Sequence, residues 1–221
     1  MASKVEDQLF AQVTTLLKTN PHLGKLINID ALDGSGNSTQ ASRLVSYLEN
    51  RLGKVLLTKE PTEGKIGTRI REVLQKKWEL SALPLQLLFS ADRGHHLDEE
   101  IIPALKDGTW VVTDRYALST LAFGTAHGIP AWQLLAMNVY YPWPNLVVVL
   151  DVPAEECARR IARGRGEKEL FEATKTLKRV RKAYLALSKT LPNIELVDGV
   201  GSEEEVFARV RSAVEDNLQF M

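Results

Sequence analysis

Short apolar runs alternate along the chain with longer stretches in which apolar residues recur every three or four positions. A short run between polar residues is typical of a buried strand, whereas the longer spacing is typical of a helix with one buried face. The runs predict strands at residues 25–30, 54–59, 109–114, 145–151 and 193–198. The periodic stretches predict helices at about residues 38–51, 65–77, 84–103, 116–124, 130–140, 154–163, 169–190 and 202–217.

This alternation predicts an α/β fold, with a five-stranded parallel sheet and helices on both faces. The run NLVVVLD at 145–151 fits this arrangement, because a strand that is apolar on both sides must be covered on both faces. In such sheets, ligands bind beyond the carboxyl ends of the strands. We therefore expect the chemistry of the protein at that edge of the sheet.

The first 24 residues predict a helical extension that packs on a domain formed by residues 25–221. Its apolar residues fall on one helical face: Val5, Leu9, Val13, Leu16 and Leu17. We do not expect a signal peptide here, because Glu6 and Asp7 interrupt the segment and no apolar core follows them.

Length and composition are those of a soluble globular protein. The chain has 221 residues, of which 44% are hydrophobic and 25% are charged, enough for one large domain with a core. Lys and Arg together number 28, equal to Asp and Glu, so overall charge favours neither nucleic acid nor anionic lipid as a partner. No window of 18 uncharged apolar residues occurs, so we expect no membrane span. Cys157 is the single cysteine, which excludes an internal disulfide and favours a buried thiol in a reducing cytoplasm.

The stretch ALDGSGNST, residues 31–39, lies between the first predicted strand and the next helix, where a phosphate-binding loop would lie. Gly34 and Gly36 allow backbone N–H groups to surround a phosphate, and the following helix N-terminus adds partial positive charge. The stretch departs twice from the pattern G-x-x-x-x-G-K-[ST], with Ala31 in place of Gly and Asn37 in place of Lys. By itself, it is equally compatible with a helix cap after a turn.

Two further clusters stand at strand ends or on the helices that follow. In FSADRGHH, the residues Phe89, Arg93 and His96 have the spacing of one helical face, which suits an aromatic ring that stacks on a base and an arginine that reads its edge. The alternative is a core phenylalanine with an ion-paired arginine. We interpret His96 as structural, with Asp92 or Asp98 as its partner.

In WVVTDRY, an apolar strand ends in Asp114, whose carboxylate is a candidate ligand of Mg²⁺ together with the hydroxyl of Ser38. Arg115 follows, and its guanidinium suits bidentate binding of a phosphate. The alternative is an Asp114–Arg115 pair that only fixes the start of a helix. Ser119 and Phe123 share a face of that helix.

DGSGNSTQASRL, TKEPTEG, LLFSADRGHH and WVVTDRYALSTLAF, in this order, resemble the thymidylate kinase family over about residues 26–218. The resemblance implies a P-loop kinase fold, ATP as phosphoryl donor with Mg²⁺, dTMP as acceptor and a homodimer. It implies phosphate binding by Ala31, Leu32, Asp33, Gly34, Ser35, Gly36, Asn37, Ser38 and Thr39. It implies dTMP binding by Asp33, Glu60, Pro61, Phe89, Arg93, Arg115, Ser119 and Phe123.

Three positions depart from the family pattern outside the loop. Lys59 stands where the family usually has Arg. Lysine keeps the positive charge but lacks the planar group with which arginine donates two parallel hydrogen bonds. Phe123 stands where Tyr is frequent, and its bulk is still expected to crowd a ribose 2′-hydroxyl. Leu170 stands where the lid pattern has Arg.

The stretch at about 162–172, ARGRGEKELFE, resembles the lid of the family, which closes over the transferred phosphoryl group. Arg163 and Arg165 are its candidate catalytic residues, beside Asp114 and Arg115. A solvated basic loop is the alternative.

Asn37, in place of the loop lysine, predicts weak phosphoryl transfer. Its short neutral amide does not extend to the β- and γ-phosphates, and loss of one preorganised donor costs about 3–4 kcal/mol of barrier. Ala31 adds about 1–2 kcal/mol of strain if its φ is positive. The expected reaction is transfer of the γ-phosphoryl of Mg·ATP to dTMP, giving dTDP. The alternatives are a nucleotide-binding descendant with weak or no turnover, and a kinase for another pyrimidine monophosphate.

Overall fold

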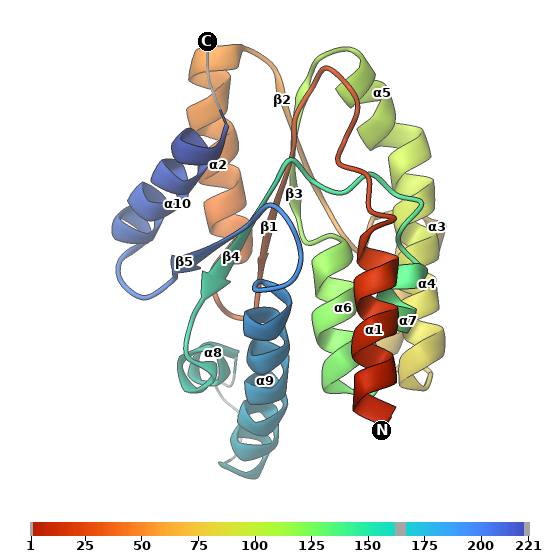
Figure 1. The fold of residues 1–221 in the computed structure, drawn as a ribbon. Coiled ribbons are helices and arrows are strands. Elements are labelled where there is room, and N and C mark those ends of the chain that lie inside the picture. The colour runs from red at the N-terminus through yellow and green to blue at the C-terminus, as the bar shows by residue number, and fades with distance from the viewer. Residues whose placement is uncertain (1, 162–166, 219–221) are drawn as a thin grey trace.

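Five parallel strands form the centre of the structure, in the order β2-β3-β1-β4-β5 (Figure 1). The computed structural model describes residues 2–161 and 167–218, without the side chains of residues 2, 3 and 167–171. The strands are β1 (Leu26–Ala31), β2 (Val55–Lys59), β3 (Trp110–Asp114), β4 (Leu146–Asp151) and β5 (Ile194–Asp198). All five lie within one residue of the predicted runs, and the predicted parallel sheet is confirmed.

Helices cover both faces of the sheet. The helical elements are α1 (Ala2–Thr14), α2 (Asn37–Leu52), α3 (Lys65–Leu74), α4 (Ala82–His96), the π-helical turn η1 (Leu97–Ile101), α5 (Ile102–Lys106), α6 (Ala117–Ala126), α7 (Ala131–Ala136), α8 (Ala154–Ile161), α9 (Glu167–Leu187) and α10 (Glu203–Asn217). Helices α2 and α10 pack together over one face, and α6 and α9 lie over the other (Figure 1). Within the described ranges, none of these helices is long and apolar enough to cross a membrane.

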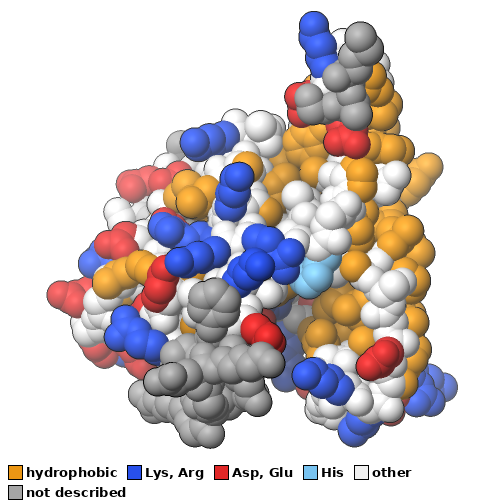
Figure 2. All heavy atoms as spheres, turned by 90° about the horizontal axis from the view of Figure 1, so that it is seen from below, with side chains coloured by type: hydrophobic (Ala, Val, Ile, Leu, Met, Phe, Trp, Pro, Cys, Tyr) orange, Lys and Arg blue, Asp and Glu red, His pale blue; other side chains and the backbone are white. Residues whose placement is uncertain are grey.

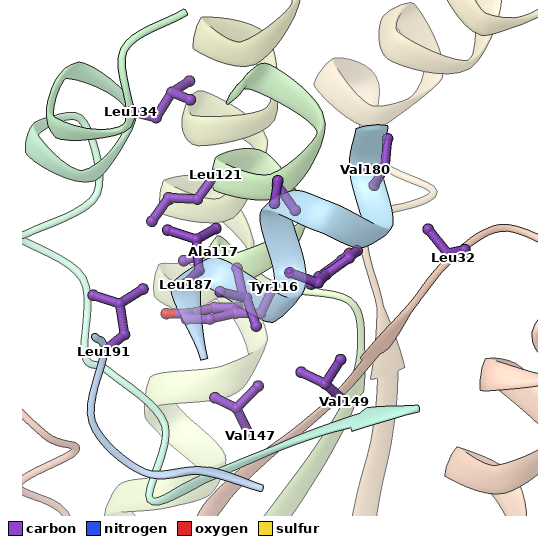
Figure 3. Packing of buried hydrophobic residues seen from close by; sticks show 14 of the residues in the cluster. Leu32, Tyr116, Ala117, Leu121, Leu134, Val147, Val149, Val180, Leu187 and Leu191 are labelled. Carbon is purple, nitrogen blue, oxygen red and sulfur yellow. The ribbon is translucent and has the colours of Figure 1, made fainter. Parts of the chain in front are cut away.

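Alternate residues of the central strands build two separate cores. In β4, Val147 and Val149 face the α6 and α9 side, whereas Leu146, Val148 and Leu150 face the α2 and α10 side. Successive side chains of a strand point to opposite faces, so a strand that is apolar at every position contributes to both cores. Figure 3 shows residues of α6, α7 and α9 gathered around Tyr116 above Val147 and Val149.

The helix expected at residues 84–103 is instead two α-helices joined by a wider turn. Helix α4 begins two residues earlier than predicted, and the π-helical turn Leu97–Ile101 separates it from α5. Pro103 lies just after the turn. Proline lacks an N–H and its ring crowds the carbonyl four residues earlier, so the preceding turn widens rather than continuing as a regular α-helix.

The N-terminal helix is shorter than its apolar pattern suggested, and only part of the predicted apolar face packs against the core. Helix α1 ends at Thr14, and Val5 and Leu16 are 54% and 57% exposed. Phe10 packs against the core instead, together with Val13 and Leu17. The helix lies against α7.

Two asparagines connect the segment after α1 to the start of β4. The side-chain nitrogen of Asn20 donates to the side-chain oxygen of Asn145 (2.9 Å) and to the carbonyl of Gly24 (2.7 Å). The same Asn145 oxygen accepts from the backbone N–H of Leu26 (2.8 Å). Thr19 also forms an isolated parallel bridge with Trp143. The extension is therefore hydrogen bonded to the domain as well as packed on it.

Candidate active site

Two neighbouring pockets at the carboxyl ends of the strands share two residues, Asp33 and Arg115. The strands end toward the lower part of Figure 1, and Figure 2 views the molecule from that side, where Lys and Arg side chains gather near the middle of the face. The phosphate-loop pocket has a volume of about 380 Å³ and the acceptor pocket one of about 510 Å³. Two ligands in them would meet at Arg115.

The wall of the phosphate-loop pocket consists of the loop that the sequence predicted. It is lined by Leu32, Asp33, Gly34, Ser35, Gly36, Asn37, Ser38 and Thr39 from the loop, with Asp114 and Arg115 from the end of β3. Gly34 and Gly36 have φ values of 80° and 92°, a region that glycine occupies without strain. The loop thus has the backbone that a phosphate cradle needs.

Ala31 does not line this pocket. It is the last residue of β1, fully buried, and its φ is not positive. The strain expected for a positive φ therefore does not arise, and the Cβ at this position packs in the core on the α2 side.

The amide of Asn37 is bonded to the sheet beneath the loop. Its nitrogen donates to the carbonyl of Ile29 (2.9 Å) and to the carboxylate of Asp114, while its side-chain oxygen is buried and has no partner among the described residues. The residue is 6% exposed. It therefore brings no charge to the pocket.

Asp114 lies between two residues of the loop. One carboxylate oxygen accepts from Asn37 and the other from the hydroxyl of Ser38. A carboxylate and a hydroxyl are hard oxygen ligands of the kind Mg²⁺ prefers, so this pair fits the ion. Within residues 2–161 and 167–218, no group of three His, Cys, Asp or Glu residues is arranged to hold a metal. The site therefore fits an ion that arrives with a nucleotide, since Mg²⁺ is usually held by few carboxylates plus phosphates.

Arg115 is held in a strained backbone conformation, with φ at 72°. Its guanidinium donates to Asp33 (2.6 Å), the carbonyl of Ala31 (3.0 Å) and the hydroxyl of Ser119 (3.1 Å). Burial alone would lower the pKa of this guanidinium, but Tyr184 and nearby carboxylates raise it above its usual value. Arg115 is therefore a fixed, fully charged group at the junction of the pockets.

Asp30 and Tyr184 support this arginine and were not predicted as site residues. One carboxylate oxygen of Asp30 accepts from the hydroxyls of Tyr184 and Ser119, each at 2.6 Å. The carboxylate lies 3.8 Å from Arg115 and its other oxygen has no partner among the described residues. Burial raises the pKa of Asp30, although Arg115 and the two hydroxyls act in the opposite direction. Asp30 could have been found from the sequence, because it is an acidic residue at the end of an apolar strand, directly before the loop.

The acceptor pocket brings together every residue predicted to bind dTMP except Arg93. Asp33, Glu60, Pro61, Phe89, Arg115, Ser119 and Phe123 line it. Apolar side chains from α3, α4 and the segment between them complete the wall, namely Leu74, Leu80, Ala82 and Leu85. An aromatic and apolar chamber that ends at an arginine has the form expected for a ligand with a flat apolar part and an anionic end.

Arg93 lies behind this wall, 1% exposed. Its terminal nitrogens donate to Asn138 (2.5 Å), Glu60 (2.6 Å) and Thr120 (3.2 Å). The guanidinium also lies over the ring of Tyr116, 4.9 Å from its centroid. Both terminal nitrogens are thus engaged by the protein, and a direct contact of Arg93 with a base stays a prediction.

His96 is structural in this geometry, as predicted, but with other partners. Its ring lies between Glu60 (3.4 Å) and Glu100 (2.9 Å). The predicted partners were wrong: Asp92 accepts from the backbone N–H and the hydroxyl of Thr62, each at 2.7 Å, and Asp98 is exposed. The turn of the π-helix brings Glu100 to the ring.

Helix α8 contacts the loop from outside and supplies an arginine that the sequence reasoning missed. One terminal nitrogen of Arg160 lies 3.3 Å from the carbonyl of Gly34 and 3.5 Å from that of Ser35. Cys157 of this helix is buried, as predicted, and burial raises the pKa of its thiol to about 11. Arg160 stands three positions before Arg163 in one basic stretch, and this proximity was the available signal.

The lid falls mostly outside the described residues. Arg163 and Arg165 lie in the range 162–166, and the side chain of Leu170 is not described either. Their predicted roles stay predictions.

A glycine loop between β1 and α2, an acid that ends the neighbouring strand, and a second chamber joined to the loop at one arginine together define a P-loop nucleotide kinase. The sequence matches the thymidylate kinase family over residues 29–210. The chain belongs to this family.

Individual relatives agree with this assignment. A probable thymidylate kinase of Pyrococcus horikoshii is 35% identical over 201 residues, which cover 88% of this chain and 98% of the relative. A thymidylate kinase of Desulfotalea psychrophila is 35% identical over 191 residues, covering 86% and 93%. The crystal structure of thymidylate kinase from Ehrlichia chaffeensis is similar with a TM-score of 0.71 and 24% identity, covering 86% of this chain and 98% of that one, and it supports the fold.

Proposed function

We propose that the protein transfers the γ-phosphoryl group of Mg·ATP to the 5′-phosphate of dTMP, giving dTDP and ADP. An oxygen of the dTMP phosphate attacks the γ-phosphorus, and the bond from that phosphorus to the bridging oxygen of the β-phosphate breaks. The observation that carries the proposal is the junction of the two pockets at Arg115 and Asp33. A donor in one pocket and an acceptor in the other would present their phosphates to the same guanidinium.

The residues of the acceptor pocket divide by chemistry. Arg115 holds the acceptor phosphate, and its bond to Asp33 keeps that carboxylate near the sugar, where it accepts from the 3′-hydroxyl. Phe89 stacks on the base, and Phe123 bounds the sugar. Glu60 and Pro61 close the end of β2. Arg93 supports the floor through Thr120 and Glu60.

The loop holds the donor phosphates with its backbone N–H groups and the N-terminus of α2. Ser38 and Asp114 would hold Mg²⁺, which would supply positive charge beside the donor phosphates. Arg163 and Arg165 of the lid bring further positive charge to the donor phosphates. This charge replaces that of the lysine which other phosphate loops carry where this chain has Asn37.

The bonding of Asn37 favours one competing function, a nucleotide-binding protein without turnover. Its amide is committed to Ile29 and Asp114, so the side chain of Asn37 brings no positive charge to the donor phosphates. Such a protein keeps the acceptor pocket and loses the charge that phosphoryl transfer needs.

A coupled assay with Mg·ATP and dTMP, run beside calorimetry of dTMP binding, tests both functions. Turnover with dTMP supports the kinase, whereas binding without turnover selects the competitor. The assay includes dUMP, dCMP and dGMP as acceptors, and a higher kcat/KM for one of these would move the substrate away from dTMP. Absence of dTMP binding would contradict both functions.

We further propose a homodimer in the cytoplasm. Large apolar side chains on the outer face of α4, Leu83 and Leu87, are 42% and 48% exposed, and pairing would cover them. A single buried cysteine suits a reducing compartment. Sedimentation equilibrium measures the pairing, and a monomer at micromolar concentration would contradict it.

A further inference from the structure

The N-terminal extension, residues 2–24, is attached to one segment of the domain, residues 137–145, which we call the strap. The extension lies outside residues 29–210, the part of the chain that matches the family. Its helix α1 packs against α7, which ends directly before the strap (Figure 1). The other contacts of the strap show what this attachment can affect.

Two backbone bonds and one side-chain bond fasten the extension to the strap. The N–H of Trp143 donates to the carbonyl of Lys18 (2.8 Å), and the N–H of Asn20 donates to the carbonyl of Trp143 (2.9 Å). The side chain of Asn20 also donates to that of Asn145 (2.9 Å). Asn20 and Trp143 are both buried. Buried hydrogen bonds hold a segment in one place, because breaking them leaves polar groups without partners.

The strap is also bonded to α4, the helix that forms one wall of the acceptor pocket. The hydroxyl of Ser90 donates to the carbonyl of Met137 (2.9 Å), and the hydroxyl of Tyr141 donates to the carbonyl of Ser90 (2.9 Å). A Cβ at Gly94 would lie 2.8 Å from the hydroxyl oxygen of Tyr141, so helix and strap are in close contact there. Ser90 directly follows Phe89, so the strap holds α4 at the point where this helix supplies an aromatic side chain to the pocket.

Asn138 of the strap connects α7 to two further residues that line the pocket. Its side-chain nitrogen donates to the carbonyl of Leu134 in α7 (2.7 Å), and its side-chain oxygen accepts from Arg93 (2.5 Å). Arg93 in turn donates to Glu60 (2.6 Å) and Thr120 (3.2 Å), which both line the pocket. The helix on which α1 packs is thus linked to the acceptor pocket through consecutive buried hydrogen bonds.

A pocket wall that is held in its binding geometry binds more tightly, because less conformational freedom is lost when the ligand enters. The donor side does not depend on this support to the same degree. The phosphate-loop pocket is lined by residues 32–39, Asp114 and Arg115, and none of them lies in α4 or in the strap. A loosened extension should therefore weaken binding of the acceptor and leave binding of the donor nearly unchanged.

We propose that the N-terminal extension is a positioning element for the acceptor site, with Phe10 and Asn20 as its positioning residues. This inference rests on the proposed function, because it takes the acceptor pocket to bind dTMP. Phe10 packs α1 onto the core, and Asn20 bonds the extension to the strap. Because coupling between two sites is reciprocal, dTMP in its pocket also stabilises the docked extension.

Calorimetry with dTMP and with ATP compares Phe10→Ala and Asn20→Ala with the unaltered protein. We expect both variants to bind dTMP about fivefold more weakly and to keep ATP affinity within about twofold. Leu16→Ala, at an exposed position of the same extension, is the control and should leave both affinities unchanged. Val210→Ala, buried on the α2 and α10 side of the sheet, should lower Tm without weakening dTMP binding. This second control separates positioning from a general loss of stability.

Amide hydrogen exchange of the unaltered protein measures the reciprocal effect. Saturating dTMP should slow exchange in α1 about fivefold, whereas ADP should leave it unchanged. Three results would overturn the inference while the proposed function stands: equal losses of dTMP and ATP affinity, a fall in Tm with unchanged dTMP affinity, or α1 exchange that does not respond to dTMP. If the unaltered protein binds no dTMP, the inference and the proposed function both fail.

Discussion

Asn37 stands where a phosphate loop ordinarily carries lysine, and its bonds show what the residue does instead. The amide joins the carbonyl of Ile29 to the carboxylate of Asp114, and so ties the loop to the ends of β1 and β3. A lysine would reach past these groups toward the β- and γ-phosphates. The present residue thus supports the cradle without neutralising its ligand.

Replacing this residue tests whether charge is what the loop lacks. We expect Asn37→Lys to raise kcat at least tenfold, since about 1.4 kcal/mol of barrier corresponds to that factor. Steady-state kinetics at saturating ATP and dTMP measure it. Asn37→Ala is the control and should give no increase, because it removes the amide without adding charge. An unchanged rate in the lysine variant would mean that the site is built around asparagine.

His96 gives a prediction about pH. Burial works to lower the pKa of its ring, but Glu60 and Glu100 outweigh burial and raise that pKa above its usual value of about 6.5. The protonated ring is therefore favoured in the folded state, and its stabilising contribution is complete below about pH 6.5. The free energy of unfolding should fall as the pH rises through the raised pKa.

Urea unfolding between about pH 6 and 8.5 measures this slope, and His96→Gln should flatten it. His127→Gln, at an exposed position, is the control and should keep the slope of the unaltered protein. If both variants have the same slope, the pH dependence of the free energy of unfolding comes from titrating groups other than His96.

At the scale of elements, the phosphate loop depends on the helix that packs against it from outside. A Cβ at Gly34 would lie 2.9 Å from the carbonyl oxygen of Cys157 and 2.9 Å from a side-chain carbon of Ile161. At Gly36 a Cβ would meet nothing within 4 Å. Loop and α8 are therefore fitted to each other at one glycine only.

Two matched substitutions separate this contact from backbone strain. Gly34→Ala and Gly36→Ala share the cost of a positive φ, about 1–2 kcal/mol. We expect Gly34→Ala to lower the free energy of unfolding by a further 1–3 kcal/mol or so, because it also forces α8 away. Denaturant titration compares the two variants. Equal losses of unfolding free energy would show that α8 moves away from the added Cβ without a further cost.

Most elements follow from the sequence pattern, and the exceptions have local causes. The strands are predictable because each is a continuous apolar run, as in residues 145–151. The turn at Leu97–Ile101 is not, since apolar spacing does not distinguish a π-helical turn from the α-helix around it. The face of α1 is misjudged in part, because Val5 and Phe10 are both apolar and only the position of α7 selects between them.

On the scale of the whole molecule, the two pockets meet because the strand order places β3 beside β1. Alternating strands and helices predict a parallel sheet but not this order, which depends on how the crossovers pack. The clusters around Asp114 and Phe89 could be assigned to one site from motif resemblance. The burial of Arg93 could not be predicted from the sequence. Its spacing shows that it shares a helical face with Phe89, but does not show how deeply that face is buried.

The lid supplies a prediction at this scale. If Arg163 and Arg165 provide the charge that Asn37 lacks, alanine at both positions should reduce kcat about a thousandfold or more, as for other arginines that enter a phosphoryl-transfer site. Arg179→Ala, at an exposed position of α9, is the control and should be neutral. Full activity in the double variant would show that other cations neutralise the donor phosphates.

The pairing of Asn20 with Asn145 has a consequence for the order of events during synthesis. The two residues are 125 positions apart, so this pair cannot form until the ribosome has reached the start of β4. At about 5–20 residues per second, that interval is roughly 6 to 25 s. During it the nascent amphipathic helix is available to chaperones, and the asparagine pair that fastens it to the domain waits for a segment made much later.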